Sequence, residues 1–138
     1  MKHLQPVILH VTRKSFLEDE VSIIHSGKAY LSRLEDGFQL VYHESSFEDS
    51  KVELEAKSGV VTCVRIADVM TECTWNAKMP TQIISKTSLG VHEFDVTTDV
   101  CQIEDNHIVI DYQLGINNQV FDRIIMMWDI KEVHHESN

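Results

Sequence analysis

The sequence predicts an all-β fold, a single closed antiparallel meander barrel of about 8–10 strands. Three observations carry this prediction. Short runs that alternate apolar and polar residues follow one another along almost the whole chain. Turn residues separate these runs, and no window holds a sustained apolar repeat of helical period. Because an open sheet of this many strands would expose its edges, we expect the sheet to close on itself.

Each expected strand carries its own alternation between two turn signals. The pattern is plainest in residues 51–57, where apolar side chains face one way and charged side chains the other. Residues 100–103 either continue the preceding strand after a bulge or form a short strand of their own. In chain order, the expected strands are residues 6–13, 18–26, 28–34, 38–44, 51–57, 60–66, 70–77, 81–87, 91–98, 107–114 and 120–130.

Turn chemistry places the hairpins between these strands. Asp36-Gly37 is the strongest signal, because glycine tolerates a positive φ and Asp-Gly suits a type I′ turn. Ser58-Gly59 is a second hairpin turn, and Ser26-Gly27 is expected to bend the chain. Pro80 ends the strand before it, since proline cannot donate to a ladder. Residues 45–50 are polar and predict a loop.

Composition bounds the class of protein. A length of 138 residues indicates one domain, residues 1–138, whose last residues, 132–138, form a polar and frayed tail. The formal net charge of -10 argues against nucleic acid and anionic membranes as partners. No apolar run is long enough to span a bilayer, and the first residues lack the pattern of a signal peptide. An odd number of cysteines without a CxxC pair indicates free thiols and a cytoplasmic location.

Several short segments, taken together and in this order, resemble the YwiB-like family of uncharacterised bacterial proteins. The resemblance covers the chain from about Gln5 to Lys131, and implies a calycin-like, or lipocalin-like, β-barrel. It brings no established activity, ligand or catalytic residue. The segments are Tyr42-His43-Glu44, Val64-Arg65-Ile66, Lys86-Thr87-Ser88-Leu89-Gly90, Val96-Thr97-Thr98 and Ile110-Asp111-Tyr112-Gln113-Leu114.

Four polar residues on otherwise apolar strand faces are the candidate ligand-binding residues. Tyr42 and Glu44 continue the face of Phe38, and Tyr112 lies on the apolar face of its strand. Arg65 lies mid-strand on an apolar face, where a charge needs a partner or an anionic ligand. We expect Arg65 and Glu44 to meet inside the barrel, with Tyr42 and Tyr112 as hydrogen-bonding partners. The alternative is an ion pair that faces solvent or only closes one barrel end.

No catalytic residue, metal site or cofactor is predicted. No His-x-His pair, HExxH or zinc-like Cys/His spacing occurs among the histidines, and no Gly-x-Ser-x-Gly elbow or phosphate-binding loop is present. The three cysteines lie inside strand patterns, where they behave as small apolar residues. The eight histidines are His3, His10, His25, His43, His92, His107, His134 and His135.

The last expected strand is apolar on both faces. If one face fills the barrel, Ile125 and Met127 face outward beside Arg123 and Asp129. A loop or the N-terminal segment could cover this patch, or it could form the interface of a homodimer.

Three functions remain open at this stage. The first is a barrel that binds a small, partly apolar molecule. The second is a structural or protein-interaction module whose barrel is filled by its own side chains. The third is an enzyme that uses Glu44 as a general base, which would need a raised carboxyl pKa in a cleft. The interior volume separates the first two. The large side chains that decide it are Phe16, Phe38, Trp75, Phe94 and Trp128.

Overall fold

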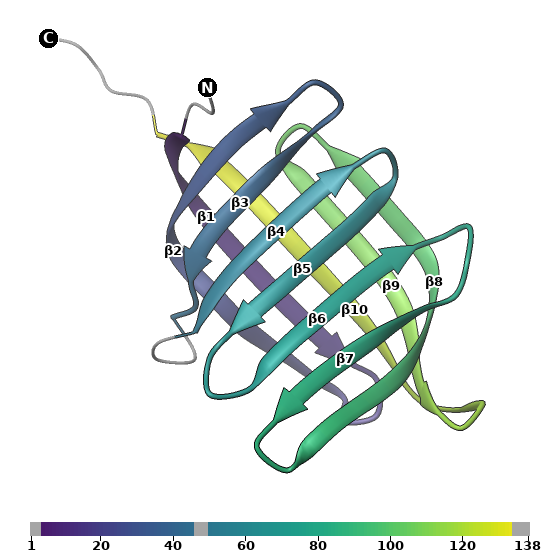
Figure 1. Ribbon diagram of the computed structural model, residues 1–138. Coiled ribbons are helices and arrows are strands. Elements are labelled where there is room, and N and C mark those ends of the chain that lie inside the picture. The colour runs from purple at the N-terminus through teal and green to yellow at the C-terminus, as the bar shows by residue number, and fades with distance from the viewer. Residues whose placement is uncertain (1–3, 46–49, 134–138) are drawn as a thin grey trace, which may run out of the picture.

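The structure, a computed structural model, describes residues 4–45 and 50–133, which form one closed antiparallel barrel (Figure 1). Around the barrel the strand order is β1-β10-β9-β8-β7-β6-β5-β4-β3-β2, so each strand pairs with its neighbours in the chain and β1 closes on β10. This confirms the predicted meander barrel. The strands are β1 (Leu4–Ser15), β2 (Glu20–Leu34), β3 (Gly37–His43), β4 (Lys51–Lys57), β5 (Val60–Ile66), β6 (Met70–Asn76), β7 (Thr81–Thr87), β8 (Gly90–Glu104), β9 (His107–Ile116) and β10 (Gln119–Glu132).

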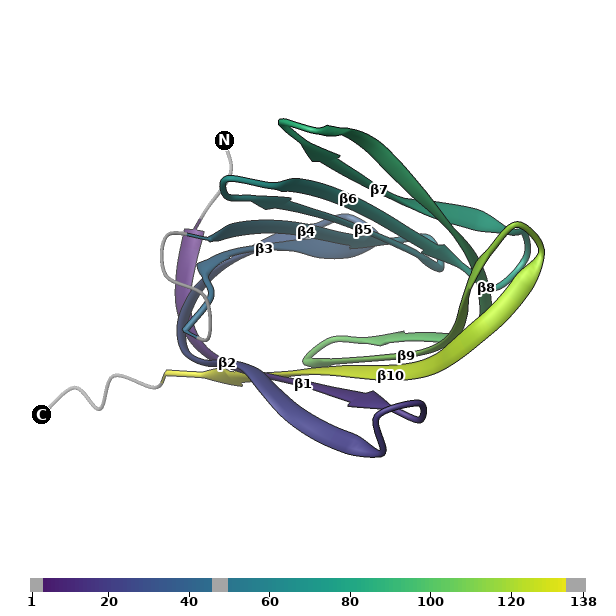
Figure 2. The same cartoon turned by 90° about the horizontal axis from the view of Figure 1, so that it is seen from below.

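The barrel is flattened, with two walls that face each other. Figure 2 shows β3 to β7 in one wall and β1, β2, β9 and β10 in the other, with β8 curving between them. Register shifts between Val11 and Thr12 in β1, and between Thr98 and Val100 in β8, mark irregularities of the kind that bend a strand. Residues 100–103 therefore continue the preceding strand. Among the described residues, no helix is long and apolar enough to cross a membrane.

Two predictions about glycines are wrong. Gly27 does not separate two strands, because β2 keeps its pairing with β1 through this residue, opposite Leu9. Gly37 starts β3 and is not among the residues with positive φ. Glycine at residue 37 allows the backbones of β3 and β4 to lie close together. A Cβ atom there would lie 1.9 Å from the carbonyl oxygen of Ala56 in β4. The hairpin exists, but its turn is one residue earlier than predicted.

Ser58-Gly59 forms the predicted hairpin turn between β4 and β5. Both residues have positive φ, 53° and 78°, as a type I′ turn requires. Asn117 and Asn118 make the same pair of left-handed conformations between β9 and β10, at 52° and 64°. Of the predicted loop 45–50, residues 46–49 lie outside the described part of the chain. The same holds for residues 134–138 of the predicted tail, whose residue 132 ends β10.

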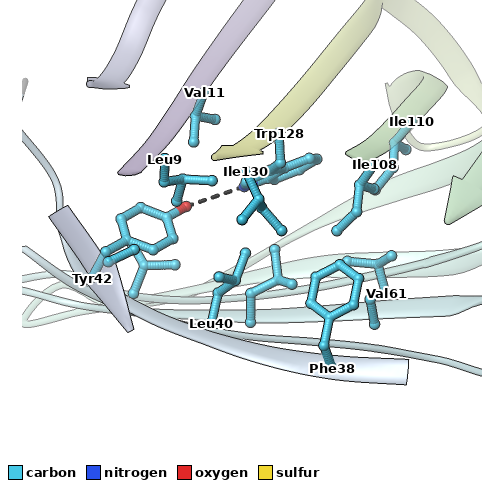
Figure 3. Packing of buried hydrophobic residues seen from close by; sticks show 14 of the residues in the cluster. Leu9, Val11, Phe38, Leu40, Tyr42, Val61, Ile108, Ile110, Trp128 and Ile130 are labelled. Atoms are coloured by element: carbon cyan, nitrogen blue, oxygen red, sulfur yellow. Dashed lines mark hydrogen bonds between the residues drawn. The ribbon is translucent and has the colours of Figure 1, made fainter. Parts of the chain in front are cut away.

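The core fills one end of the barrel, where the β2–β3, β4–β5 and β8–β9 hairpins turn; we call this the packed end. Figure 3 shows side chains from both walls meeting there, among them Phe38, Leu40 and Ile108. Toward the middle, the indole N–H of Trp128 donates to the hydroxyl of Tyr42 across the barrel, at 3.2 Å. On the outside, Ile125 and Met127 are half-buried. They lie on the outer face of β10, as expected from its alternation.

Asp122 holds the β1–β2 hairpin against β10. Its carboxylate is buried and accepts a hydrogen bond from the hydroxyl of Ser15 at 2.7 Å. It also accepts from the backbone N–H groups of Leu17 at 2.9 Å and Arg123 at 2.8 Å. Burial alone would raise the pKa of Asp122, but these hydrogen bonds outweigh it and lower the pKa. The folded protein therefore favours the ionised form.

We expect Gly37→Ala to destabilise the fold more than Gly59→Ala. A methyl group at residue 37 collides with β4 backbone, whereas one at residue 59 meets nothing within 4 Å and only strains a left-handed residue. That strain costs about 1 kcal/mol. Urea unfolding of the two variants measures the difference. Equal losses would contradict the assignment of Gly37 to close strand packing.

We expect the stabilising effect of Asp122 to disappear in acid. A lowered folded-state pKa gives stability that is present above the unfolded value, about 3.9, and lost as pH falls through the folded value. Wild type should exceed Asp122→Asn in free energy of unfolding at neutral pH. The gap should shrink as the pH falls below about 4. A gap that stays constant across the acid range would refute this role.

Candidate functional site

The four predicted site residues line one cavity inside the barrel. Tyr42 comes from β3 and Glu44 from the residue just after it, while Arg65 lies on β5 and Tyr112 on β9. The cavity has a volume of about 510 Å³. It lies toward the end opposite the packed end, where the β1–β2, β5–β6 and β9–β10 connections turn; we call this the open end (Figure 1).

The cavity exists because inward side chains become more polar toward the open end. Successive inward positions of a strand are two residues apart. On β3 the buried row passes from Phe38 and Leu40 to Tyr42, and Glu44 continues it beyond the strand end. On β5 the row that begins with buried Val61 leads to Arg65. Apolar side chains close the packed end, and polar ones surround space at the other.

Glu44 and Arg65 form an ion pair at the cavity wall. The Nε of Arg65 donates to Oε1 of Glu44 at 2.6 Å. The Glu44 side chain is 6% exposed, against 32% for Arg65, so the carboxylate is the buried partner. Burial raises the pKa of Glu44, and the charge of Arg65, together with its hydrogen bond to the carboxylate, offsets part of that rise.

The prediction that Tyr42 and Tyr112 form hydrogen bonds with this ion pair is wrong. The hydroxyl of Tyr42 accepts from Trp128, and its ring lies 4.8 Å from the ring of His25. Tyr112 offers its ring, whose centroid is 5.6 Å from that of Trp75. Burial raises the pKa of both tyrosines, so both hydroxyls stay protonated. Their contribution to the cavity is aromatic surface.

His25 supports the segment that carries Glu44. Its Nδ1 accepts from the backbone N–H of Ser45, at 3.1 Å. The other ring nitrogen, Nε2, therefore carries the proton and donates to the carbonyl of Lys28 at 3.1 Å. The backbone N–H of Glu44 donates to the carbonyl of Ser50, at 2.9 Å. These contacts hold the carboxylate at the open end.

Sequence reasoning missed several residues of the cavity. Arg13 on β1 also lines it, following the buried inward row of Val7, Leu9 and Val11. Because the first strand is fairly apolar on both faces, the sequence alone did not show that this row, and with it Arg13, points inward. Trp75 lines the cavity too, and its indole N–H has no hydrogen-bond partner among the described residues.

Two cysteines face each other across β5 and β6 on the cavity wall. Cys63 and Cys73 are register partners and are free thiols. Burial raises the pKa of Cys63 and raises that of Cys73 to about 12, so neither is ionised at neutral pH. In the part of the chain that the structure describes, no three His, Cys, Asp or Glu side chains gather as a metal site would require. The cavity is therefore best described as aromatic with a charged rim.

We expect Glu44 to make the fold less stable as the pH rises. A raised folded-state pKa gives stability that is full below the unfolded value, about 4.3, and lost as pH rises through the folded value. Wild type should therefore lose stability relative to Glu44→Gln between acid and neutral pH. In an Arg65→Met background the loss should be larger, because the compensating charge is gone. Unfolding titrations over this pH range measure both, and a flat difference would contradict the burial of Glu44.

Comparisons with known proteins agree with this architecture. The crystal structure of the YwiB protein from Bacillus subtilis is similar to this chain, with a TM-score of 0.76 and 18% sequence identity. The match covers 95% of this chain and 94% of that one, and at this identity it shows a shared fold. The search of curated proteins gives no match. The family model described as "Domain of unknown function (DUF1934)" matches residues 8–127. The chain therefore belongs to the DUF1934 family, in agreement with the resemblance seen in its sequence.

Proposed function

We propose that this barrel binds one small, partly apolar molecule in the cavity at its open end. The observation that carries the proposal is a cavity of about 510 Å³ in a barrel whose other end holds a cluster of buried apolar side chains. Ligand sites are typically concave, mostly apolar and equipped with a few polar groups that orient the ligand. Trp75, Tyr112 and Trp128 supply the apolar surface here, and Glu44 and Arg65 the polar groups.

The positions of the large side chains favour a binding barrel over one filled by its own side chains. Phe38, Trp75 and Trp128 are buried. Phe16 is 41% exposed, with the charged ends of Lys14 and Arg123 over its ring. Phe94 packs against Phe121 and does not border the cavity. Two of the five aromatic residues that could have filled the barrel therefore do not line the cavity.

An enzyme that uses Glu44 as general base has one feature in its favour. Burial raises the pKa of that carboxyl within a cavity, as general bases require. However, Oε1 of Glu44 is already engaged by Arg65 at 2.6 Å, an arrangement that suits a fixed polar wall. We therefore favour binding. The three free cysteines agree with a cytoplasmic location, which forms part of the proposal.

The proposal is tested by binding of N-phenylnaphthylamine, a neutral aromatic probe whose fluorescence rises in apolar surroundings. We expect saturable binding of one molecule per chain. Cys63→Phe places a ring in the cavity and should weaken binding at least about tenfold, or 1.4 kcal/mol. Thr62→Phe is the matched control, because Thr62 is the preceding residue and is exposed on the outer face of β5.

Two results would overturn the proposal. The first is no saturable binding to the folded wild type. The second is equal weakening by the Cys63 and Thr62 variants. Thr71→Phe, at another position of the cavity wall, replaces Cys63→Phe if circular dichroism shows that the latter does not fold. Native mass spectrometry of protein purified gently from its own host would reveal a resident small molecule.

A further inference from the structure

We propose that the ligand carries an anionic group and that Arg13 receives it. This inference rests on the proposed binding function and adds the chemical class of the ligand and a residue that selects it. The class is an oxyanion, such as a carboxylate or a sulfonate, attached to an apolar body. Arg13 lies on β1, within the inward row that begins with Val7 and Leu9, and it borders the cavity.

Arg13 is the cation of the cavity that lacks a partner. Within residues 4–45 and 50–133, it takes part in no ion pair or hydrogen bond of its side chain. Arg65, the other arginine of the cavity, is already neutralised by Glu44 at 2.6 Å. The charged side chains of the cavity are thus Arg13, Arg65 and Glu44. With Glu44 ionised, the cavity carries one positive charge in excess, in a protein whose formal net charge is -10.

The carboxylate that acts on Arg13 is committed elsewhere. Asp122 interacts electrostatically with Arg13. Its two oxygens, however, already accept hydrogen bonds from Ser15, Leu17 and the backbone of Arg123. Asp122 serves the β1–β2 hairpin and leaves the guanidinium of Arg13 facing the cavity. A partly buried cation without a partner is costly, and an oxyanion with two oxygens suits the planar fork of arginine.

The neighbours of Arg13 define how such a ligand would lie. Opposite Arg13 in the sheet are Ser22 on β2 and Met126 on β10, and both border the cavity. Deeper in the barrel the wall becomes aromatic, with Trp75 and Trp128 at 5.9 Å between ring centroids. An oxyanion at Arg13 therefore leaves the apolar body pointing toward these rings. This order of polar and apolar surface matches an amphipathic anion.

The experiment compares two probes that differ in one group. Anilinonaphthalenesulfonate contains the ring system of N-phenylnaphthylamine with an added sulfonate. Its affinity is measured by displacement of the neutral probe, so that only binding in the cavity is read. We expect the sulfonate to bind wild type more tightly. In Arg13→Met its affinity should fall about tenfold or more, while that of the neutral probe changes less than about twofold.

The control variants separate charge from structure. Lys14→Met removes a cation from the next residue of β1, whose ammonium lies over the outward ring of Phe16, and should change neither affinity. Arg13→Lys keeps the charge and should retain most of the preference for the sulfonate. Arg13→Gln serves as a second polar replacement if the methionine variant is unstable.

Each outcome has a distinct meaning. If the neutral probe binds and the sulfonate has no advantage, or keeps its advantage in Arg13→Met, the anionic class is wrong and the binding function stands. If Lys14→Met weakens the sulfonate as much as Arg13→Met, the effect comes from overall charge and the role of Arg13 is refuted. If neither probe binds the folded protein, the proposed function itself fails.

Discussion

The pairing of β1 with β10 is the constraint on which the rest of this structure depends. It joins the first and last strands over nine residue pairs, from Val7 opposite Glu132 to Ser15 opposite Ile124. Once the sheet is closed, alternation along each strand sends every second side chain inward. A slip of one residue in this pairing would turn Leu9 and Val11 outward and would also remove Arg13 from the cavity. Core and site thus depend on one register.

Closure divides the interior into a stable half and a functional half. At the packed end, apolar side chains from both walls fill the space, and their burial supplies the main stabilisation. At the open end, Arg13, Glu44 and Arg65 point inward instead of apolar side chains. The interior there holds a cavity lined by charged groups. The hydrogen bond between Trp128 and Tyr42 lies at the boundary, where both side chains are core members and also border the cavity. The packed half can therefore hold the site rigid.

Local signals were enough for most strands and for part of the site. Residues 51–57 carry charged side chains on one face only, so the sequence alone showed which face of this strand points inward. Ser58-Gly59 forms the hairpin turn that its residue types predicted. Glu44 and Arg65 were found because charge on an apolar face demands a partner. The predictions that were wrong depend on contacts between residues that are distant in sequence. The need for glycine at residue 37 comes from the backbone of Ala56, and the break expected at Gly27 is overridden by pairing with β1.

The hydrogen bonding of the tyrosines shows the same limit. Tyr42 bonds Trp128, 86 residues away, and no local pattern indicates that the two meet across the barrel. Arg13 was missed for another reason. The first strand is fairly apolar on both faces, so its inward row could not be told from its outward row before closure was known. Which face of β1 points into the barrel is determined by its pairing with β2 and β10, and the sequence of β1 alone does not contain this information.

The central claim is that one end of the barrel is filled and the other accepts a small molecule. An NMR titration of isotope-labelled protein with N-phenylnaphthylamine tests it most directly. The account predicts that the indole N–H signals of Trp75 and Trp128 shift together with amides around Arg65. Amides around Phe38 and Ile108 at the packed end should stay in place. Shifts confined to the outer faces, or spread equally over both ends, would contradict it.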